Sequence, residues 1–215
     1  MSNHLAVDAI EDTRVEMSLP KPLHVRIARH VSNILAPVAI SGPFIVLVAL
    51  YHAHSLLAAM FYAGVTLFFL SFGPMVYILI GVRLGKLSDA DVSYRTERTG
   101  PFLFGIVSIT VGLITLMTIH GPKNLETVLM STAVSGVIMM VTTLWWKISI
   151  HSSSLAGAAT MLTALYGAMM LPAFLLLPLV GWSRVVLGRH TVAQVVAGSL
   201  VSMALATLFI LIRGV

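Results

Sequence analysis

Hydrophobic residues occupy long blocks of the chain that are separated by short polar stretches. Blocks of about 20 or more largely apolar residues cover 33–53, 55–82, 101–120, 125–146 and 190–212. A helix of about 20 apolar residues is long enough to cross a bilayer. The pattern therefore predicts an all-α fold, a polytopic bundle of transmembrane helices.

A further apolar block, 152–187, is long enough to be either one span or two short ones. Gly167 and Pro172 bracket a weak point in its middle, because proline removes an intrahelical donor and clashes with the preceding turn. The two halves would each reach about 25 Å, which suits a tilted or slightly thinned span. The pattern thus leaves the count at six or seven spans.

The N-terminal region is polar up to residue 20 and then becomes amphipathic. Leu23, Ile27 and Val31 recur at a spacing of four, and the basic residues of 21–32 lie off that stripe. This pattern is typical of a helix lying at the membrane surface. We therefore divide the chain into a polar tail with an interfacial helix, 1–32, and an integral membrane domain, 33–215.

Composition narrows the class of protein further. The chain of 215 residues is 58% hydrophobic and 10% charged, which excludes an ordinary water-soluble globule and a disordered chain. The net charge is +5 without a dense basic run, so no nucleic-acid partner is expected. Cysteine is absent, which excludes disulfides, thiolate catalysis and cysteine–zinc sites.

The remaining polar residues cluster in three islands, at 83–100, 147–154 and 183–194. Taken one at a time, their members fit membrane anchors, helix caps and turns. Together they supply the groups that phosphate transfer needs, since the planar fork of arginine matches phosphate oxygens and histidine can attack phosphorus or protonate a leaving oxygen. The candidates in chain order are Arg95, Arg98, Lys147, Ser149, His151, Arg184, His190 and Gln194.

The segment SRVVLGRHTVAQVVAG, 183–198, resembles the third signature of the type 2 phosphatidic acid phosphatase superfamily. That signature is Ser-Arg, five residues, His, three residues and Asp; Ser183, Arg184 and His190 match it, and Gln194 replaces the Asp. Ser149-Ile150-His151 keeps the Ser-x-His spacing of the second signature. A basic stretch before Pro101 keeps the character of the first, and the three follow the family's order. The chain is thus identified as a divergent member of this superfamily.

The resemblance implies a metal-independent lipid phosphatase without a cofactor. His190 would be the nucleophile that forms a phosphohistidine, and His151 would protonate the leaving alcohol and then activate water. Phosphate binding would fall to the basic residues and one serine of the islands. The substrate implied is a lipid or isoprenoid phosphate or diphosphate with its tail between the helices. The residues implied in phosphate binding are Arg184, Arg95, Arg98, Ser149 and Lys147.

Replacing the family's Asp by Gln194 leaves two functions open. Gln194 lies four residues after His190, so on a helix its amide oxygen can orient the ring but supplies no charge. Asp89 or Asp91 of the first island could supply that charge in space. The alternative function is a catalytically inactive relative that serves as a structural or lipid-binding subunit of a membrane complex.

A single site requires the three islands to lie on one face of the membrane. The crossings between His151 and Ser183 must then be even in number, which favours two short spans in 152–187 and seven in all. In that arrangement 11 of the 13 lysines and arginines fall on the face of the islands. By the positive-inside tendency, we expect that face and the N-terminus to be cytoplasmic. We expect the membrane to be a plasma or inner membrane, and its lipids to be further partners of the protein.

Overall fold

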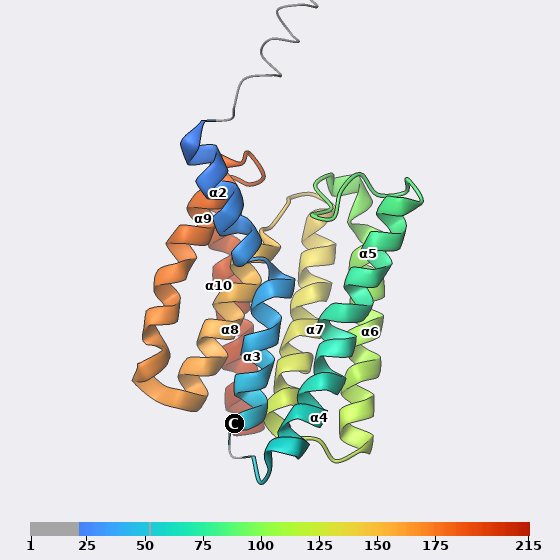
Figure 1. Ribbon diagram of the computed structural model, residues 1–215, viewed down its shortest axis with the longest axis vertical. Helices are drawn as coiled ribbons and strands as arrows, with labels where there is room; N and C mark the ends of the chain where they lie inside the picture. Colours follow the sequence, from blue (N-terminus) through green and yellow to red (C-terminus); the bar gives the residue numbers. More distant parts are fainter. Residues whose placement is uncertain (1–21, 52) are drawn as a thin grey trace, which may run out of the picture.

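The computed structural model describes residues 22–51 and 53–215 (Figure 1). Every regular element in this described part of the chain is a helix. Six helical stretches within it are long and apolar enough to cross a membrane, so the expected all-α integral membrane protein is confirmed at this level. They are Leu23–Leu50, Leu56–Arg83, Arg95–Thr118, Lys123–Thr143, Ile150–Val186 and Val192–Arg213.

Local sequence signals explain where several helices begin. Pro37 occupies the first turn of α3, where its missing N–H costs nothing, and Ser55 accepts a hydrogen bond from Ala58 N to cap α4. The elements are α2 (Leu23–Ile34), α3 (Pro37–Leu50), α4 (Leu56–Leu67), the π-helical turn η1 (Phe68–Phe72), α5 (Gly73–Arg83), the 3₁₀ turn η2 (Arg95–Glu97), α6 (Thr99–Thr118), α7 (Lys123–Thr143), α8 (Ile150–Tyr166), the 3₁₀ segment η3 (Gly167–Leu175), α9 (Leu176–Val186) and α10 (Val192–Arg213).

The main core lies where α3, α4, α6, α7 and α8 meet. Its fully buried side chains come from three of these helices and include Ile45, Leu116, Leu125 and Leu129. Apolar side chains also cover the outside of the bundle, as expected where helices face lipid rather than water.

The stretch from 150 to 186 folds back on itself. Helix α8 ends at Tyr166, and the next residue, Gly167, has φ +72, a backbone conformation open to glycine because it has no Cβ. Segment η3 then contains Pro172, and α9 returns alongside α8 (Figure 1). As a result His151 and Arg184, at opposite ends of this stretch, lie 3.5 Å apart. By length and composition alone the stretch counts as one candidate span.

Helix α2 precedes α3 across a break at Leu35 and Ala36, and it packs along α9 (Figure 1). It buries Ala28 and Ser32 and leaves Leu23 and Ile27 exposed. The polar tail expected within 1–32 lies outside the described residues as far as residue 21.

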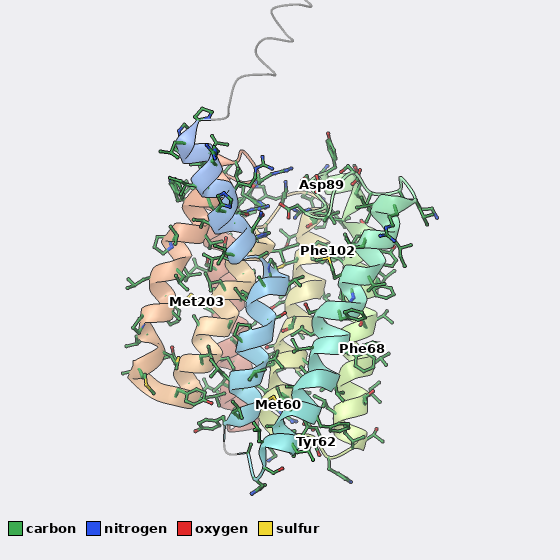
Figure 2. The ribbon with its side chains drawn as sticks, viewed as in Figure 1. Met60, Tyr62, Phe68, Asp89, Phe102 and Met203 are labelled. Atoms are coloured by element: carbon green, nitrogen blue, oxygen red, sulfur yellow. The ribbon has the colours of Figure 1, made fainter. Side chains whose placement is uncertain are left out.

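Loops 84–94, 144–149 and 187–191, together with η2, lie at one end of the bundle, which we call the island end (Figure 1). Asp89 marks this end in Figure 2, and Met60 and Tyr62 mark the opposite end. The fold thus brings the three polar islands to the same end, because an even number of helices separates each island from the next.

Candidate functional site

A cavity of about 370 Å³ opens below the loops of the island end. Charged and imidazole side chains line the part near the loops. Mainly apolar side chains of α3, α5, α6, α7 and α8 line the rest, together with several serine and threonine hydroxyls. Between His151 and Met161, both of which line it, α8 rises about 15 Å. The charged and imidazole groups that line it are Asp91, Arg98, His151, Arg184 and His190.

Four of these side chains are buried although they carry or can carry charge. The exposed fractions are 3% for Arg98, 7% for His151, 2% for Arg184 and 6% for His190. Burying a charge is costly unless it is paired and hydrogen-bonded. Such a cluster, gathered from the N-cap of α6, from α8 and α9 and from the loop before α10, is therefore typical of a functional site rather than of an anchor.

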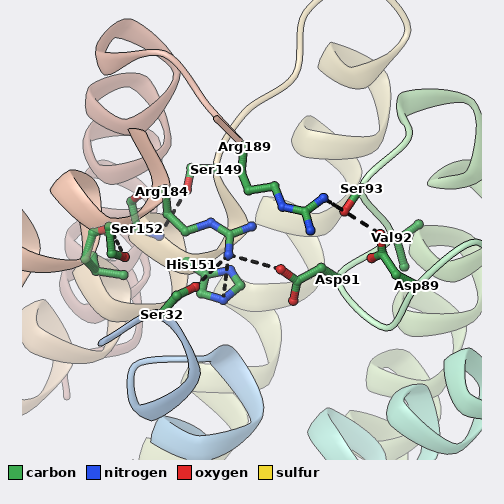
Figure 3. A network of polar contacts seen from close by, with 12 residues as sticks. Ser32, Asp89, Asp91, Val92, Ser93, Ser149, His151, Ser152, Arg184 and Arg189 are labelled. Carbon is green, nitrogen blue, oxygen red and sulfur yellow. Dashed lines mark hydrogen bonds and ion pairs between the residues drawn. The ribbon is translucent and has the colours of Figure 1, made fainter. Parts of the chain in front are cut away.

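Arg184 is the centre of the polar network (Figure 3). It lies in the last turn of α9, where the helix dipole favours a cation. Its Nη1 donates to Ser32 Oγ at 2.7 Å and to Asp91 Oδ2 at 3.1 Å, and it approaches His151 Nε2 at 3.5 Å. Its Nε is buried and has no hydrogen-bond partner among the described residues, so the guanidinium retains a donor for a ligand.

The contact with His151 defines the state of that ring. A guanidinium has only donors, so His151 Nε2 faces Arg184 as an acceptor. The neutral ring then carries its proton on Nδ1. His151 is thus poised to take up a proton at Nε2 when negative charge arrives beside Arg184.

Arg98 joins two of the islands. Its Nε donates to Val92 O at 3.1 Å, and its Nη1 donates to Ile148 O at 3.3 Å. These bonds hold the two loops together, and Arg98 also adds a second buried guanidinium to the lining of the cavity.

His190 precedes α10 and is oriented by Gln194, as the spacing of four predicts. Gln194 forms a capping box with Thr191, in which Gln194 Oε1 accepts from Thr191 N at 3.2 Å. The same oxygen lies 3.2 Å from His190 Nδ1. Since that oxygen is an acceptor, Nδ1 must donate the proton, and Nε2 keeps its lone pair for attack.

The surroundings also keep His190 neutral. Burial is the main reason that the pKa of His190 falls to about 3, and the charges of Lys147, Arg98 and Arg184 lower it further. The contact with Gln194 raises the pKa in the opposite direction. At neutral pH the ring is therefore the unprotonated form that a nucleophile requires.

Lys147 and Arg189 bind the loop of the first island through Ser93 and Asp89. Lys147 Nζ donates to Ser93 O and to Arg189 O, each at 3.0 Å. Arg189 Nη1 bonds Ser93 Oγ and lies 3.8 Å from Asp89 Oδ2. Burial lowers the pKa of Lys147 to about 8, and the charges of the neighbouring arginines act in the same direction.

The two aspartates of the first island do not take the place expected of the missing carboxylate. Asp91 pairs with Arg184 and Asp89 with Arg189, and neither makes a described contact with His190. Burial raises the pKa of Asp91, but the charge of Arg184 and the hydrogen bond that it donates outweigh burial, so the net direction is down. Asp91 is therefore a carboxylate that pairs with the arginine of the third island.

Three expected phosphate ligands do not line the cavity. The first is Lys147, whose ammonium bonds the loop carbonyls described above. Arg95 is exposed, and its Nη1 donates to Leu144 O at 2.7 Å. Ser149 is fully buried as the cap of α8, where its Oγ accepts from Ser152 Oγ at 2.8 Å. Ser32 contacts Arg184 although no sequence pattern marked it, because the contact depends on how α2 packs.

Within the described residues, no group of three or more histidine, aspartate and glutamate side chains is arranged to hold a metal ion. The donors that gather at the cavity are instead guanidinium and imidazole groups, which suit an anion.

Comparison of the chain with protein-family models, with curated proteins and with solved structures found no match. The function is therefore inferred from the cavity and the side chains that surround it.

Proposed function

We propose that this protein is a membrane phosphatase that hydrolyses a lipid or isoprenoid phosphate or diphosphate through a phosphohistidine. The observation that carries the proposal is a cavity that joins four buried groups, Arg98, Arg184, His151 and His190, to a largely apolar space between the helices. Such a cavity matches a ligand with an anionic head and a hydrocarbon tail. The proposal places the chain as a divergent relative of the type 2 phosphatidic acid phosphatases.

Binding in this proposal follows from charge and shape. Arg184 and Arg98 bind the phosphate oxygens, and the tail occupies the apolar part of the cavity along α8. A guanidinium in a site of low dielectric stabilises the added charge of the transition state more strongly than it would in water.

The chemistry uses the two histidines in sequence. His151 Nε2 first takes up a proton from water as the anionic head binds. His190 Nε2 then attacks phosphorus, a P–N bond forms, and the P–O bond to the lipid breaks as His151 gives that proton to the leaving oxygen. Water then attacks phosphorus while His151 takes one of its protons, and the P–N electron pair returns to His190. The products are the lipid alcohol and inorganic phosphate, or the lipid monophosphate and inorganic phosphate from a diphosphate.

The proposed placement in the membrane has seven spans. Helix α8, and η3 with α9, are taken as two short spans that form a hairpin, and α2 lies at the surface as an interfacial helix. Among described residues, nine of the eleven lysines and arginines then lie on the face of the island end, the exceptions being Lys123 and Arg213. By the positive-inside tendency that face is cytoplasmic.

A second candidate is a catalytically inactive relative that binds such a lipid as a subunit of a membrane complex. The observation that favours it is Gln194, because an amide beside His190 orients the ring without stabilising an imidazolium. This candidate predicts ligand binding without turnover.

The test is release of inorganic phosphate by the full-length protein purified in nanodiscs. Phosphatidic acid, a prenyl phosphate and a prenyl diphosphate serve as substrates. The matched variants are His190→Gln and His54→Gln, since His54 is exposed at the opposite end. We expect the wild type and His54→Gln to release phosphate and to form an acid-labile phosphoprotein intermediate. His190→Gln should do neither. Equal background release from all three proteins would refute the phosphatase, and binding without release would favour the inactive relative.

A further inference from the structure

The segment Asp89–Ser93 provides oxygen atoms to four cationic side chains drawn from all three islands. We call it the oxygen strap. Its contacts are Asp91 Oδ2 with Arg184 Nη1 at 3.1 Å, Val92 O with Arg98 Nε at 3.1 Å, Ser93 O with Lys147 Nζ at 3.0 Å, and Ser93 Oγ with Arg189 Nη1. Two of these cations, Arg98 and Arg184, line the cavity. The strap thus occupies cations that a bound phosphate would use.

The backbone of the strap is held in an unfavourable conformation. Val92 has φ +47, in the left-handed region that β-branched residues rarely adopt, and its side chain is buried. Such strain persists only where surrounding contacts hold it in place, and it clusters at functional sites. Here the contacts are those of the strap itself, so releasing them also releases strain.

The two partners of the central ion pair differ in their freedom to move. The side chain of Arg184 is 3% exposed, and that of Asp91 is 41% exposed. Arg184 is anchored by Ser32 inside the bundle, whereas Asp91 lies on a loop at the surface. Exchange of ligands at Arg184 therefore proceeds by departure of Asp91 into water.

We propose that Asp91 is an internal competitor for the phosphate and thereby a determinant of specificity. In the free protein its carboxylate occupies Arg184, and a ligand's phosphate displaces it and loosens the oxygen strap. This inference rests on the proposed function only in that the ligand carries a phosphate, and it does not require turnover.

The competition selects for the charge of the ligand. A terminal phosphate bears close to two negative charges at neutral pH and offers three oxygens, so it can replace a carboxylate on Arg184. A phosphodiester bears one negative charge, as the carboxylate does, so replacing the carboxylate on Arg184 brings no gain in electrostatic attraction. Asp91 therefore favours terminal phosphates over the phosphodiester head groups that surround the protein in its membrane.

The first experiment measures binding of inorganic phosphate to the full-length protein in phosphatidylcholine nanodiscs by calorimetry. The variants are Asp91→Asn and the matched control Asp89→Asn, which removes a charge from the same strap but from Arg189 rather than Arg184. If Asp91 holds Arg184 in about nine molecules of ten, its removal raises the apparent affinity about tenfold. We expect that gain for Asp91→Asn and a change below about twofold for Asp89→Asn. An unchanged or weaker affinity in Asp91→Asn, or equal gains in both variants, would overturn the proposal.

The same proteins test the selection by charge. Dimethyl phosphate is a soluble phosphodiester probe, and we expect its binding to become measurable in Asp91→Asn while the wild type prefers inorganic phosphate. Preference for inorganic phosphate that is identical in the two proteins would contradict the role in specificity.

A second experiment follows the strap directly. The chain has no cysteine, so Tyr94→Cys, at a site 64% exposed beside the strap, accepts a single spin label. We expect saturating inorganic phosphate to increase the mobility of the label in the background of wild-type Asp91. In the Asp91→Asn background the label should be mobile from the start. Bound phosphate with unchanged label mobility would refute displacement.

The outcomes separate this inference from the proposed function. A wild type that binds inorganic phosphate with strap release but hydrolyses no lipid phosphate refutes the phosphatase and leaves the competitor in place. Absence of phosphate binding in both the wild type and Asp91→Asn refutes the competitor.

Discussion

Both ends of the bundle hold an arginine paired with a carboxylate, and at the island end the pair lies beside a cavity and two buried histidines. At the opposite end Arg213, in the last turn of α10, pairs with Glu126 in the first turn of α7. Both charges there lie at the helix ends that stabilise them. At the island end Arg184 pairs with Asp91, which lies on a loop and is far more exposed than Glu126.

The difference separates a structural ion pair from an exchangeable one. The side chain of Glu126 is 11% exposed and that of Arg213 is 23% exposed. If either partner moved away, the other charge would remain largely buried without a counter-charge, which is costly. Asp91 can leave Arg184 for water, and the vacated guanidinium faces a cavity. Buried charge thus indicates chemistry where one partner is free to leave and space exists for a substitute.

The largest expected effect is that removing the arginine costs activity at the island end and stability at the opposite end. Arg184→Met should lower kcat/KM for phosphate release about 10³-fold, because it removes charge stabilisation in the transition state. Arg213→Met should leave kcat of the folded protein unchanged and lower the free energy of unfolding by about 3 kcal/mol, because Glu126 loses its partner. Phosphate release and chemical denaturation are measured for each variant. If the two variants lost activity and stability to similar extents, the distinction between the two ion pairs would be wrong.

A smaller loss is expected where α10 approaches the island end. A Cβ on Gly198 would lie 2.8 Å from Ser149 O, a backbone atom, so Gly198→Ala must shift α10 relative to α8. The shift moves His190 away from His151, and a misplacement near 1 Å can cost about 100-fold in rate. We expect kcat to fall about 10- to 100-fold.

The control for that variant is Gly64→Ala in α4, where a Cβ meets no atom within 4 Å. Its activity should equal that of the wild type. A Gly198→Ala protein with full activity would show that the distance between α8 and α10 is not critical.

A gain of about tenfold in kcat is expected for Gln194→Glu. The carboxylate keeps both acceptor contacts of the amide oxygen, with Thr191 N and with His190 Nδ1, and adds the charge that stabilises an imidazolium. Single-turnover formation of the phosphoprotein measures the step directly. A slower Gln194→Glu enzyme would show that the site is adapted to a neutral residue here.

The smallest expected effect is a shift in the titration of His190. After burial, the charge of Lys147 is the largest cause that lowers the pKa of His190 to about 3. Lys147→Gln should therefore raise that pKa while leaving it below the ordinary 6.5, and the acid limb of kcat/KM should move to higher pH. Titration of labelled imidazoles by NMR, with His190→Gln for assignment, checks the direction. A pKa that stays or falls would contradict the electrostatic account.

The chain itself determined the parts of this protein that depend on neighbours in sequence. Apolar blocks of spanning length fixed the helices, because a backbone in lipid must satisfy its own hydrogen bonds. The spacing of four between His190 and Gln194 predicted their contact, which forms because Gln194, in the first turn of α10, reaches back past the cap Thr191. The break at Gly167 was likewise readable from residue type.

Only the tertiary structure decided which of the polar residues meet at the cavity. Arg95 and Arg98 both reach carbonyls of the 144–149 loop, but only Arg98 turns toward the cavity. Arg184 meets Asp91 and Ser32 across 93 and 152 residues of chain. Such contacts follow from how α2, α9 and the strap pack together. Periodicity is a local property of the chain, whereas the pairing of a buried charge depends on which distant side chains the packed helices bring within hydrogen-bonding distance.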